Sequence, residues 1–311
     1  MKAEIAQAAK LLKAGRLVAF PTETVYGLGA DASSASAVAR LYAVKRRPAD
    51  HPVIVHFDTA ERAFTWAREV PAAARTLARR FWPGPLTLIL KRSSLAPDFI
   101  TGRQDNVGVR VPAHPVAHQL LAAFGGGIAA PSANRFGHVS PTTAAHVRAD
   151  LGADVDMVLE GGQSAVGIES TIVDLSRGGP MVLRPGRISA AELEAALGKP
   201  LGGRMDDPPR HSGGLERHYA PRTPARLVPA HELDREIARL QDKVAVLAFS
   251  RPDERVDYWL RMPRDPIAYA HRLYAALREL DGAECEAMLI EAPPESPEWA
   301  AVRDRLRRAC G

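Results

Sequence analysis

Short apolar runs alternate with segments of helical periodicity along the chain. The runs have the length of buried strands, and in the helical segments apolar residues recur every three or four positions. Before residue 200, strands are predicted at 17–20, 53–57, 86–90, 107–112, 128–130, 155–159, 169–173 and 181–185. Helices are predicted at 1–16, 33–45, 59–69, 71–81, 115–124, from 140 onward and at 189–197, where Ser189 and Glu192 form a capping box. This mixture predicts an α/β fold.

The pattern changes after residue 200. Residues 201–224 are rich in Gly, Pro and charge and show no apolar periodicity, which predicts a linker. Alternation then resumes, with strands predicted at 225–228, 244–249 and 287–290 and helices at 231–240, 266–280 and 298–309. This alternation predicts a small Rossmann-like α/β domain with a parallel sheet. We therefore expect domains at 1–200 and 225–311, joined by the linker 201–224.

The stretch from Pro21 to Gly29 gathers polar groups directly after a predicted strand, and it reads Pro-Thr-Glu-Thr-Val-Tyr-Gly-Leu-Gly. Pro21 stops further ladder pairing, and Gly27 and Gly29 allow backbone geometry closed to other residues. Because a helix is expected from residue 33, this loop is predicted to join a strand to a helix. It is either an ordinary turn with exposed hydroxyls or a ligand-binding loop.

Basic residues stand beside several predicted strand ends. The candidate anion-binding residues are Lys45, Arg47, Arg110 and Arg184, which an open sheet could bring together. Arg110 lies inside an apolar strand, where a guanidinium is costly to bury without an anionic partner. It therefore predicts either a buried ion pair with an Asp or Glu, or a bidentate grip on a substrate carboxylate.

Two further polar loops follow the same design. Ser132 and Asn134 come directly after the apolar run at 128–130, and Ser140 precedes a predicted helix. Helix N-termini with small hydroxyls suit phosphate and other anions. Such residues are more often simple caps, so the loops alone leave both interpretations open.

Motifs for nucleotide binding and covalent catalysis do not occur in the sequence. There is no G-x-x-x-x-G-K-[ST], and Gly27-Leu28-Gly29 does not continue as G-x-G-x-x-G. There is no G-x-S-x-G or H-E-x-x-H, and no cysteine stands beside a plausible base. If ATP binds, other groups hold it, and covalent catalysis and zinc hydrolysis are disfavoured.

Composition narrows the class of protein. The chain has 311 residues, 46% hydrophobic and 25% charged, which suffices for two domains with a substantial core. Its 2 cysteines form no C-x-x-C pair, which disfavours a disulfide framework or structural zinc. A net charge of +5 suits nucleotide or RNA but is also typical of a solvated surface. No apolar run approaches the ~20 residues that span a bilayer, so we expect a cytoplasmic protein without a membrane partner.

The motifs occur in a diagnostic order. After the loop at 21–29 come Lys-Arg-Arg-Pro at 45–48, Val-x-Val-Arg-x-Pro at 107–112, Ala-Pro-Ser-Ala-Asn at 130–134, Ser-Pro-Thr at 140–142, Gly-Gly-x-x-x-Val-Gly-x-Glu-Ser-Thr at 161–171 and Leu-Arg-Pro-Gly at 183–186. This order resembles the YrdC-like family of threonylcarbamoyl-AMP synthases. Residues 213–221 and the last 90 or so residues resemble the linker and accessory domain of its long form. The resemblance implies a YrdC-like twisted mixed sheet with flanking helices, followed by the linker and a small Rossmann-like domain.

The resemblance also implies a reaction. L-threonine, bicarbonate and ATP with Mg²⁺ would give threonylcarbamoyl-AMP and pyrophosphate, the chemistry of a nucleotidyltransferase. The attacking carbamate oxygen belongs to the substrate, so no catalytic residue is implied, only positioning and charge neutralisation. Mg²⁺ is expected to be held by the ATP phosphates, with no tightly bound organic cofactor. A downstream threonylcarbamoyl-transferase protein would pass the group to the tRNA adenosine next to the anticodon.

The resemblance implies two sets of binding residues. The set for threonine is Thr24, His56, Arg110, Ala130 and Ser170. In it, Arg110 would hold the threonine carboxylate and Ala130 would contribute its backbone. The set for ATP is Lys45, Arg47, His51, Asn106, Ser132, Asn134, Ser140, Arg184 and Tyr219. Of these, Tyr219 would close over the site from the linker.

Several positions depart from the family pattern or keep open roles. His51 stands where the family usually has Asn, and an imidazole replaces only one amide hydrogen bond. Ser212 stands where the family usually has Pro, which should loosen the linker. Glu23 and Glu169 could orient basic groups or hold magnesium through water. For each residue, simple structural hydrogen bonding is favoured over these two roles. The remaining histidines are expected at the surface.

Three functions compete. The synthase is favoured. An RNA-binding module is second because the chain is basic and the fold resembles an RNA-binding surface, but 6% aromatic content is low for single-strand binding, so a weak RNA contact is the most we expect. Third is a carbamoyl-transfer role like that of the related domain in hydrogenase maturation proteins, whose acylphosphatase module and cysteine-rich zinc fingers have no counterpart in this sequence.

Overall fold

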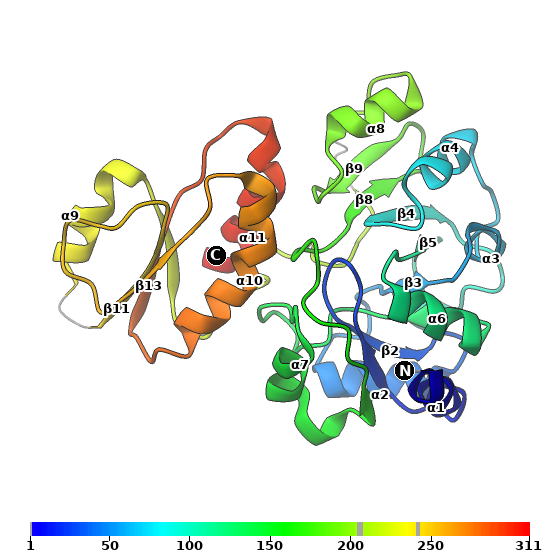
Figure 1. Ribbon diagram of the computed structural model, residues 1–311. Helices are drawn as coiled ribbons and strands as arrows, with labels where there is room; N and C mark the ends of the chain where they lie inside the picture. The colour runs from blue at the N-terminus through cyan, green and yellow to red at the C-terminus, as the bar shows by residue number, and fades with distance from the viewer. Residues whose placement is uncertain (1, 204–207, 241–242) are drawn as a thin grey trace.

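The computed structural model describes residues 2–203, 208–240 and 243–311. Residue 1 of the first expected helix and residues 204–207 of the expected linker lie outside the described residues. Two sheets with their helices lie side by side, the larger formed by the first part of the chain and the smaller by the last (Figure 1). The expectation of an α/β fold is confirmed.

The larger sheet is mixed, with the strand order β7-β1-β2-β6-β3-β5-β4-β8-β9 in the described residues. The sheet contains parallel pairs such as β3 with β5 and antiparallel pairs such as β4 with β5. Its strands are β1 Val18–Phe20, β2 Gly27–Asp31, β3 Ile54–His56, β4 Leu86–Lys91, β5 Asn106–Arg110, β6 Ile128–Ala129, β7 Met157–Val158, β8 Thr171–Asp174 and β9 Met181–Arg184. The mixed sheet expected from the sequence is confirmed.

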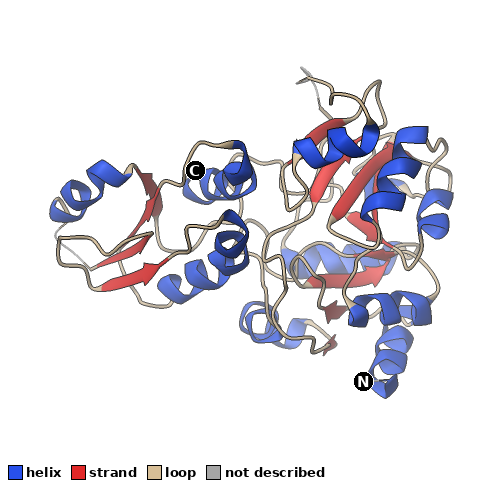
Figure 2. Ribbon diagram, turned by 45° about the horizontal axis from the view of Figure 1, so that its top comes forward, coloured by secondary structure: helices blue, strands red, loops and turns tan. Residues whose placement is uncertain are grey.

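Helices flank this sheet on both faces (Figure 2). They are α1 Lys2–Lys13, α2 Ala35–Lys45, α3 Ala60–Thr65, α4 Ala72–Phe81, α5 Asp98–Thr101, α6 Pro115–Phe124, α7 Ala144–Leu151 and α8 Ala190–Leu197, with a 3-10 turn η1 at Gly152–Asp154. Leu12 of α1 and Leu120 of α6 pack with Phe20 in one apolar cluster. The capping box of Ser189 and Glu192 forms as predicted, since each side chain bonds the other residue's backbone.

The loop after β1 is the main correction to the predicted elements. The sequence predicted that it joins a strand to a helix, but Gly27–Asp31 forms β2, which pairs antiparallel with β1. A side chain at Gly29 would lie 3.0 Å from the Val18 carbonyl oxygen and 3.0 Å from the Phe20 ring, so only glycine lets this strand pass so closely. The loop is therefore the turn of a hairpin, and its polar residues stand at one end of the sheet.

The second sheet is parallel throughout, with the order β10-β13-β11-β12. Its strands are β10 Ala225–Val228, β11 Val244–Ala248, β12 Tyr258–Arg261 and β13 Ala287–Glu291. Its helices are α9 Leu233–Ala238, α10 Pro266–Asp281 and α11 Ala300–Cys310, with 3-10 turns η2 Ala230–Glu232 and η3 Pro297–Trp299. The parallel sheet is confirmed, although β12 was not predicted, since Tyr258 is exposed and the strand shows no buried alternation.

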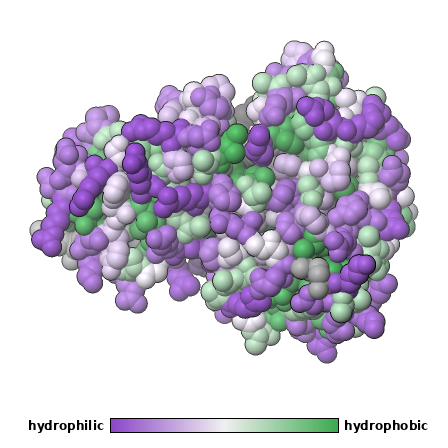
Figure 3. Space-filling view, in the orientation of Figure 1, coloured by the Kyte–Doolittle hydropathy of each residue, from purple (hydrophilic) through white to green (hydrophobic). Residues whose placement is uncertain are grey.

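Helices α10 and α11 form the side of the second domain that faces the first (Figure 1). Val25, Val139 and Ile168 of the first domain join the apolar cluster built around α10. Arg278 of α10 makes an ion pair with Asp150 at 2.5 Å. Most of the face in Figure 3 is hydrophilic, with apolar residues gathered where the two domains meet. No helix in the described residues has the length and apolar character needed to cross a bilayer.

Candidate functional site

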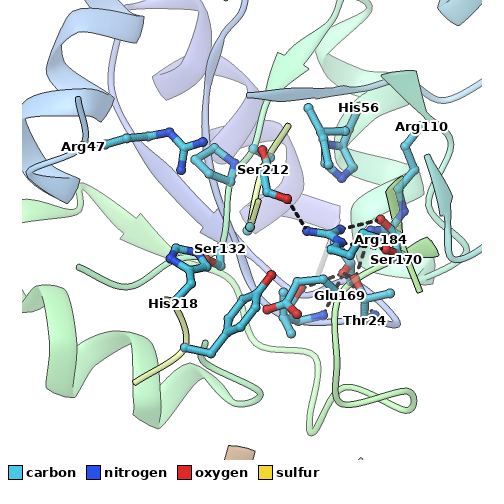
Figure 4. Close-up of a pocket in the computed structure, with 18 residues that line it drawn as sticks. Thr24, Arg47, His56, Arg110, Ser132, Glu169, Ser170, Arg184, Ser212 and His218 are labelled. Atoms are coloured by element: carbon cyan, nitrogen blue, oxygen red, sulfur yellow. Dashed lines mark hydrogen bonds between the residues drawn. The ribbon is translucent and has the colours of Figure 1, made fainter. Parts of the chain in front are cut away.

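A pocket forms where several strands of the larger sheet end, beside the hairpin loop and the linker (Figure 4). It brings together nine of the predicted site residues: Thr24, Arg47, His56, Arg110, Ala130, Ser132, Ser170, Arg184 and Tyr219. His56 and Arg110 stand at the ends of β3 and β5, which are register partners, and Arg184 ends β9. The sheet thus gathers residues that are far apart in sequence.

Arg110 makes the buried ion pair that was one of its two predicted roles. Its Nη2 lies 2.6 Å from Glu23 Oε1, its Nη1 donates to Thr24 Oγ1 at 2.9 Å and its Nε donates to the Gly84 carbonyl at 3.3 Å. A guanidinium has five N–H donors, so donors remain for a ligand. Glu23 therefore orients a basic group, and its other oxygen accepts the structural hydrogen bond that the sequence favoured, from the Ala113 backbone N–H at 3.1 Å.

His56 stands beside this arginine as a neutral ring. Burial, together with the charge of Arg110, lowers the pKa of His56 to about 3. Its Nδ1 has no hydrogen-bond partner among the described residues. A neutral imidazole with a free nitrogen can donate to or accept from a bound ligand.

Arg184 and Ser170 form a second polar unit of the pocket. Arg184 Nε donates to the Ser170 carbonyl at 3.0 Å, and its Nη2 donates to Ser170 Oγ at 3.1 Å. Its Nη1 donates to the carbonyl of Ser212 in the linker at 2.9 Å. The same hydroxyl of Ser170 lies 2.8 Å from Thr87 Oγ1. This guanidinium therefore connects β8, β9 and the linker.

Arg47 reaches the pocket, but Lys45 does not line it. Arg47 donates to the Pro52 carbonyl at 2.7 Å and lies 5.3 Å from the centre of the Phe136 ring. Lys45 donates from Nζ to the carbonyls of Ser132 and Asn134, each at 2.6 Å. Burial and the charge of Arg47 hold the pKa of Lys45 well below its usual range. In this structure Lys45 supports the loop that carries Ser132.

The other predicted ATP residues do not line the pocket. Asn134 donates to the carbonyls of Arg135 and His138 at 2.8 Å, and its Oδ1 is buried without a partner in the described residues. Ser140 donates to Glu169 at 2.6 Å. His51 packs edge-on against a phenylalanine, and Asn106 begins β5 in register with Lys91.

The linker supplies residues that the sequence analysis ranked too low. His218 lines the pocket and is buried, which lowers its pKa to about 3. His211 is also held neutral by burial, with a pKa of about 4. The expectation that the remaining histidines lie at the surface was therefore wrong for His218, whereas His211 is half-buried. The position of His218 directly before Tyr219, inside the recognised linker motif, was the signal that could have identified it.

Glu169 is the one carboxylate among the described residues that line the pocket. It accepts from Arg305 Nε at 2.7 Å, from Tyr274 at 2.9 Å and from Ser140. These contacts agree with the structural hydrogen bonding that the sequence favoured for Glu169, and one of them also orients a basic group. No cluster of three metal-ligating side chains occurs in the described residues. With its oxygens occupied, Glu169 does not suit direct coordination of Mg²⁺.

The linker nearly fills the pocket. The free volume is about 50 Å³, far below the roughly 300–1,000 Å³ typical of small-molecule sites. Gly213 and Tyr219 close it from the linker side, and Tyr219 has a left-handed backbone at φ 63°. The structure therefore shows the linker lying in the space next to the arginines.

The fold and the site together define a class. Three arginines, small hydroxyls and a neutral histidine meet at one end of a mixed α/β sheet, an arrangement that suits small anionic molecules. Two family models cover the chain: Sua5/YciO/YrdC, described as telomere recombination, matches residues 10–186, and the threonylcarbamoyl-AMP synthase C-terminal domain matches residues 188–311. The chain belongs to the threonylcarbamoyl-AMP synthase family in its two-domain form, which confirms the resemblance inferred from the sequence.

Named relatives match over nearly the whole chain. The threonylcarbamoyl-AMP synthase of Pyrococcus abyssi is 40% identical, covering 98% of this chain and 93% of its own. That of Bacillus subtilis is 37% identical, covering 99% and 93%. The crystal structure of P. abyssi Sua5 complexed with L-threonine has a TM-score of 0.93 at 37% identity, covering 100% of this chain and 95% of that one. E. coli YciO shares the fold over 60% of this chain, with a TM-score of 0.53.

Proposed function

We propose that this protein condenses L-threonine, bicarbonate and ATP to threonylcarbamoyl-AMP and pyrophosphate, for N6-threonylcarbamoyladenosine modification of tRNA next to the anticodon. The observation that carries the proposal is the Arg110 guanidinium, which lines the pocket, is fixed by Glu23 and Thr24, and has more N–H groups than these bonds use. The full-length match to a structure complexed with L-threonine supports the same assignment.

Threonine would bind with its carboxylate on Arg110. Thr24, His56 and Ser170 stand around that guanidinium, and Ala130 presents its backbone from the end of β6. A preformed ion pair keeps the guanidinium in place before the ligand arrives, so little side-chain ordering remains to oppose binding. His56 is neutral and adds no charge of its own.

The nucleophile comes from the substrates. Bicarbonate and the threonine amine give a carbamate and water, and a carbamate oxygen then attacks the α-phosphorus of ATP while pyrophosphate leaves. The protein holds the two anionic reactants in line and neutralises charge that moves onto pyrophosphate. Arg47 and Arg184 are the cations of the pocket that remain for this task.

ATP would lie on the other side of the pocket. Ser132, Arg47, Arg184 and Tyr219 line that space. Lys45, His51, Asn106, Asn134 and Ser140 would support it from behind or meet the nucleotide after rearrangement. Because the linker leaves about 50 Å³ free, we propose that its segment 212–219, which lines the pocket, withdraws to admit ATP and then closes over it. This assigns catalysis to residues 1–200 and leaves 225–311 as the domain to which the linker returns.

Mg²⁺ would enter with the ATP phosphates, where it supplies charge neutralisation for the leaving pyrophosphate. The cytoplasm, where ATP and tRNA are available, is the proposed location. A threonylcarbamoyl-transferase protein is the proposed downstream partner, since a mixed anhydride of this kind hydrolyses unless another enzyme accepts it. Any contact with RNA would be weak.

Pyrophosphate release by the purified protein tests the proposal. With ATP and Mg²⁺, release should require both threonine and bicarbonate. Arg110→Ala should lower it by about tenfold to a hundredfold, because charged hydrogen bonds are worth ~1.5–3 kcal/mol. Arg68→Ala, which removes a surface pair with Asp105, is the matched control and should leave release unchanged. Release that ignores threonine, or salt-dependent RNA binding by a folded protein without turnover, would contradict the synthase and favour the RNA-binding alternative.

A further inference from the structure

We propose that two residues of the second domain, Arg305 on α11 and Tyr274 on α10, are positioning residues for the pocket in the first domain. They act through Glu169 and set the placement of Ser170, Arg184 and the linker. The proposal rests on the synthase function proposed above and identifies groups that hold its site in the working geometry.

The contacts to Glu169 come from three separate elements. Arg305 is fully buried, and it donates from Nε to Glu169 Oε2 at 2.7 Å and from Nη2 to the Glu169 carbonyl at 3.2 Å. Tyr274 donates to the same Oε2 at 2.9 Å. Ser140 of the first domain donates to Oε1 at 2.6 Å. Both carboxylate oxygens and the backbone of residue 169 are therefore fixed.

The position of Glu169 directly affects the neighbouring residues of the pocket. The next residue, Ser170, accepts two hydrogen bonds from Arg184, one on its carbonyl and one on its hydroxyl. A shift of the backbone at 169 would therefore move both a predicted threonine contact and a predicted ATP contact. Misplacement of reacting groups by about 1 Å can cost two orders of magnitude in rate.

The same two helices hold the linker. The Arg305 guanidinium lies 5.2 Å from the centre of the Tyr219 ring, and the Tyr219 and Tyr274 rings lie 5.8 Å apart. The carbonyl of Arg308, one turn further along α11, accepts from the backbone N–H of His218 at 2.9 Å. The residues that fix Glu169 thus also fix the part of the linker that closes the pocket.

A structural role alone would not favour these groups. A buried ion pair is costly to desolvate, and apolar residues of similar size often stabilise an interface as well or better. The interface already contains such residues, since Val25, Val139 and Ile168 pack with α10. A charged pair whose anion lines the pocket is therefore better explained by placement of the site than by adhesion of the domains.

Steady-state kinetics of two variants test the proposal. Tyr274→Phe removes one neutral donor and keeps the ring, so kcat for pyrophosphate release should fall about threefold to tenfold. Arg305→Gln removes a charged donor, so kcat should fall about tenfold to a hundredfold. In Arg305→Gln/Glu169→Gln the loss should be smaller than the product of the two single losses, because both residues act through one contact.

The pH profile supplies a readout that adhesion alone would not change. Burial tends to raise the pKa of Glu169, but the charges of Arg305 and Arg184 outweigh it and hold that pKa below its usual value. In Arg305→Gln that pKa should rise, so the acid limb of kcat should move to higher pH. The ionisable groups that face Glu169 from neighbouring elements are Arg305 and Asp304 on α11, Tyr274 on α10, Arg184 on β9, and His218 and Tyr219 in the linker.

Two controls separate the alternatives. Arg307→Gln removes an exposed arginine of α11 that pairs with Asp304, and His271→Ala removes an interface contact to the Ala165 carbonyl. Both should keep wild-type kcat and pH profile. If Tyr274→Phe, which should fold, and Arg305→Gln lower only the melting temperature while kcat and the acid limb stay as in wild type, the positioning role is wrong. If Arg305→Gln is insoluble, Tyr274→Phe decides. Absence of threonine-dependent release in the wild type would instead refute the proposed function.

Discussion

The arginines of the pocket are each held in place by a different kind of partner. Arg110 is fixed by a carboxylate, Arg184 by a serine carbonyl and hydroxyl, and Arg47 by backbone carbonyls and an aromatic ring. Burial lowers the pKa of Arg47 and Arg184 from the usual arginine value. Because Arg110 is the one of the three that forms an ion pair with a carboxylate, the cavity remains attractive to anions.

Gly213 offers a test of how closely the linker must approach. A Cβ at this position would lie 2.0 Å from the Tyr219 hydroxyl, and its φ of +76° disfavours other residues. Tyr219 is buried, so either its ring or the linker backbone has to move. We expect Gly213→Ala to displace the linker. In a pyrophosphate-release assay, kcat/KM for ATP should then fall by more than about fivefold, which is the order of magnitude expected of a strained backbone contact.

Gly179→Ala is the matched control, since nothing lies within 4 Å of a Cβ there. It should keep wild-type kinetics. Equal kcat/KM for ATP in both variants would mean that the linker does not need its close approach.

Local motifs made much of the site predictable. Thr24, Arg110 and Ser170 each lie in a recognisable stretch, and the sheet brings them together as expected. The partner of Arg110 was not predictable in detail, because the sequence offered both an internal carboxylate and a substrate for the same guanidinium. In the structure the internal carboxylate is Glu23, and the guanidinium keeps N–H groups that a substrate carboxylate could use.

At the scale of elements, helix ends are defined by capping side chains. Ser189 accepts from the backbone N–H of Glu192, whose carboxylate accepts in return from the N–H of Ser189. Similar single caps begin α2 at Ser34 and α7 at Thr143. These residues explain why the helix starts could be predicted within a few positions.

The cap of α8 can be tested by substitution. Ser189→Ala should lower the free energy of unfolding by ~1 kcal/mol, because the backbone N–H of Glu192 loses its acceptor. The measurement is the midpoint of urea denaturation. Ser189→Asp preserves a capping oxygen and should stay near wild type, so an equal loss in both variants would mean that the cap itself contributes nothing.

Elements were harder to predict where packing overrides local pattern. The segment Gly27–Asp31 has few residues that favour strands, yet it forms β2 because glycines let it approach Phe20 and Val18. Tyr258–Arg261 forms an edge strand whose side chains are only partly buried, so no alternation marks it in the sequence. In both cases the strand is defined by its neighbours in the sheet.

At the scale of the whole molecule, buried neutral histidines connect stability to pH. His56 and His218 have pKa values lowered to about 3, each chiefly by burial. In the unfolded chain such a ring takes up a proton near pH 6.5. The unfolded state therefore binds more protons than the folded state between about pH 6.5 and 3, and stability falls as the pH falls through this window.

Acid denaturation provides the measurement. Below pH 6.5 each of these histidines should lower the free energy of unfolding by ~1.4 kcal/mol per pH unit. Urea denaturation at a series of pH values should show this slope, and His56→Gln should make it shallower. An identical slope in the variant would show that His56 is protonated in the folded protein.

The contact between domains was beyond prediction from the sequence. Arg305 lies in α11 among other charged residues, a pattern that indicates a solvated helix face, yet it is fully buried. Periodicity shows which face of a helix is apolar but does not show which charged side chain reaches a partner 136 residues away. The domains could therefore be predicted separately, but not the ion pair between them.

The ion pair of Glu169 and Arg305 also bears on how the protein can evolve. Loss of Arg305 leaves the buried Glu169 carboxylate without its ion-pair partner, so we expect single substitutions at this position to be selected against. We expect the two positions to be inherited as a pair across the two-domain members of the family. A chimera that joins the first domain of one lineage to the second domain of another should retain activity only where both parents carry this pair.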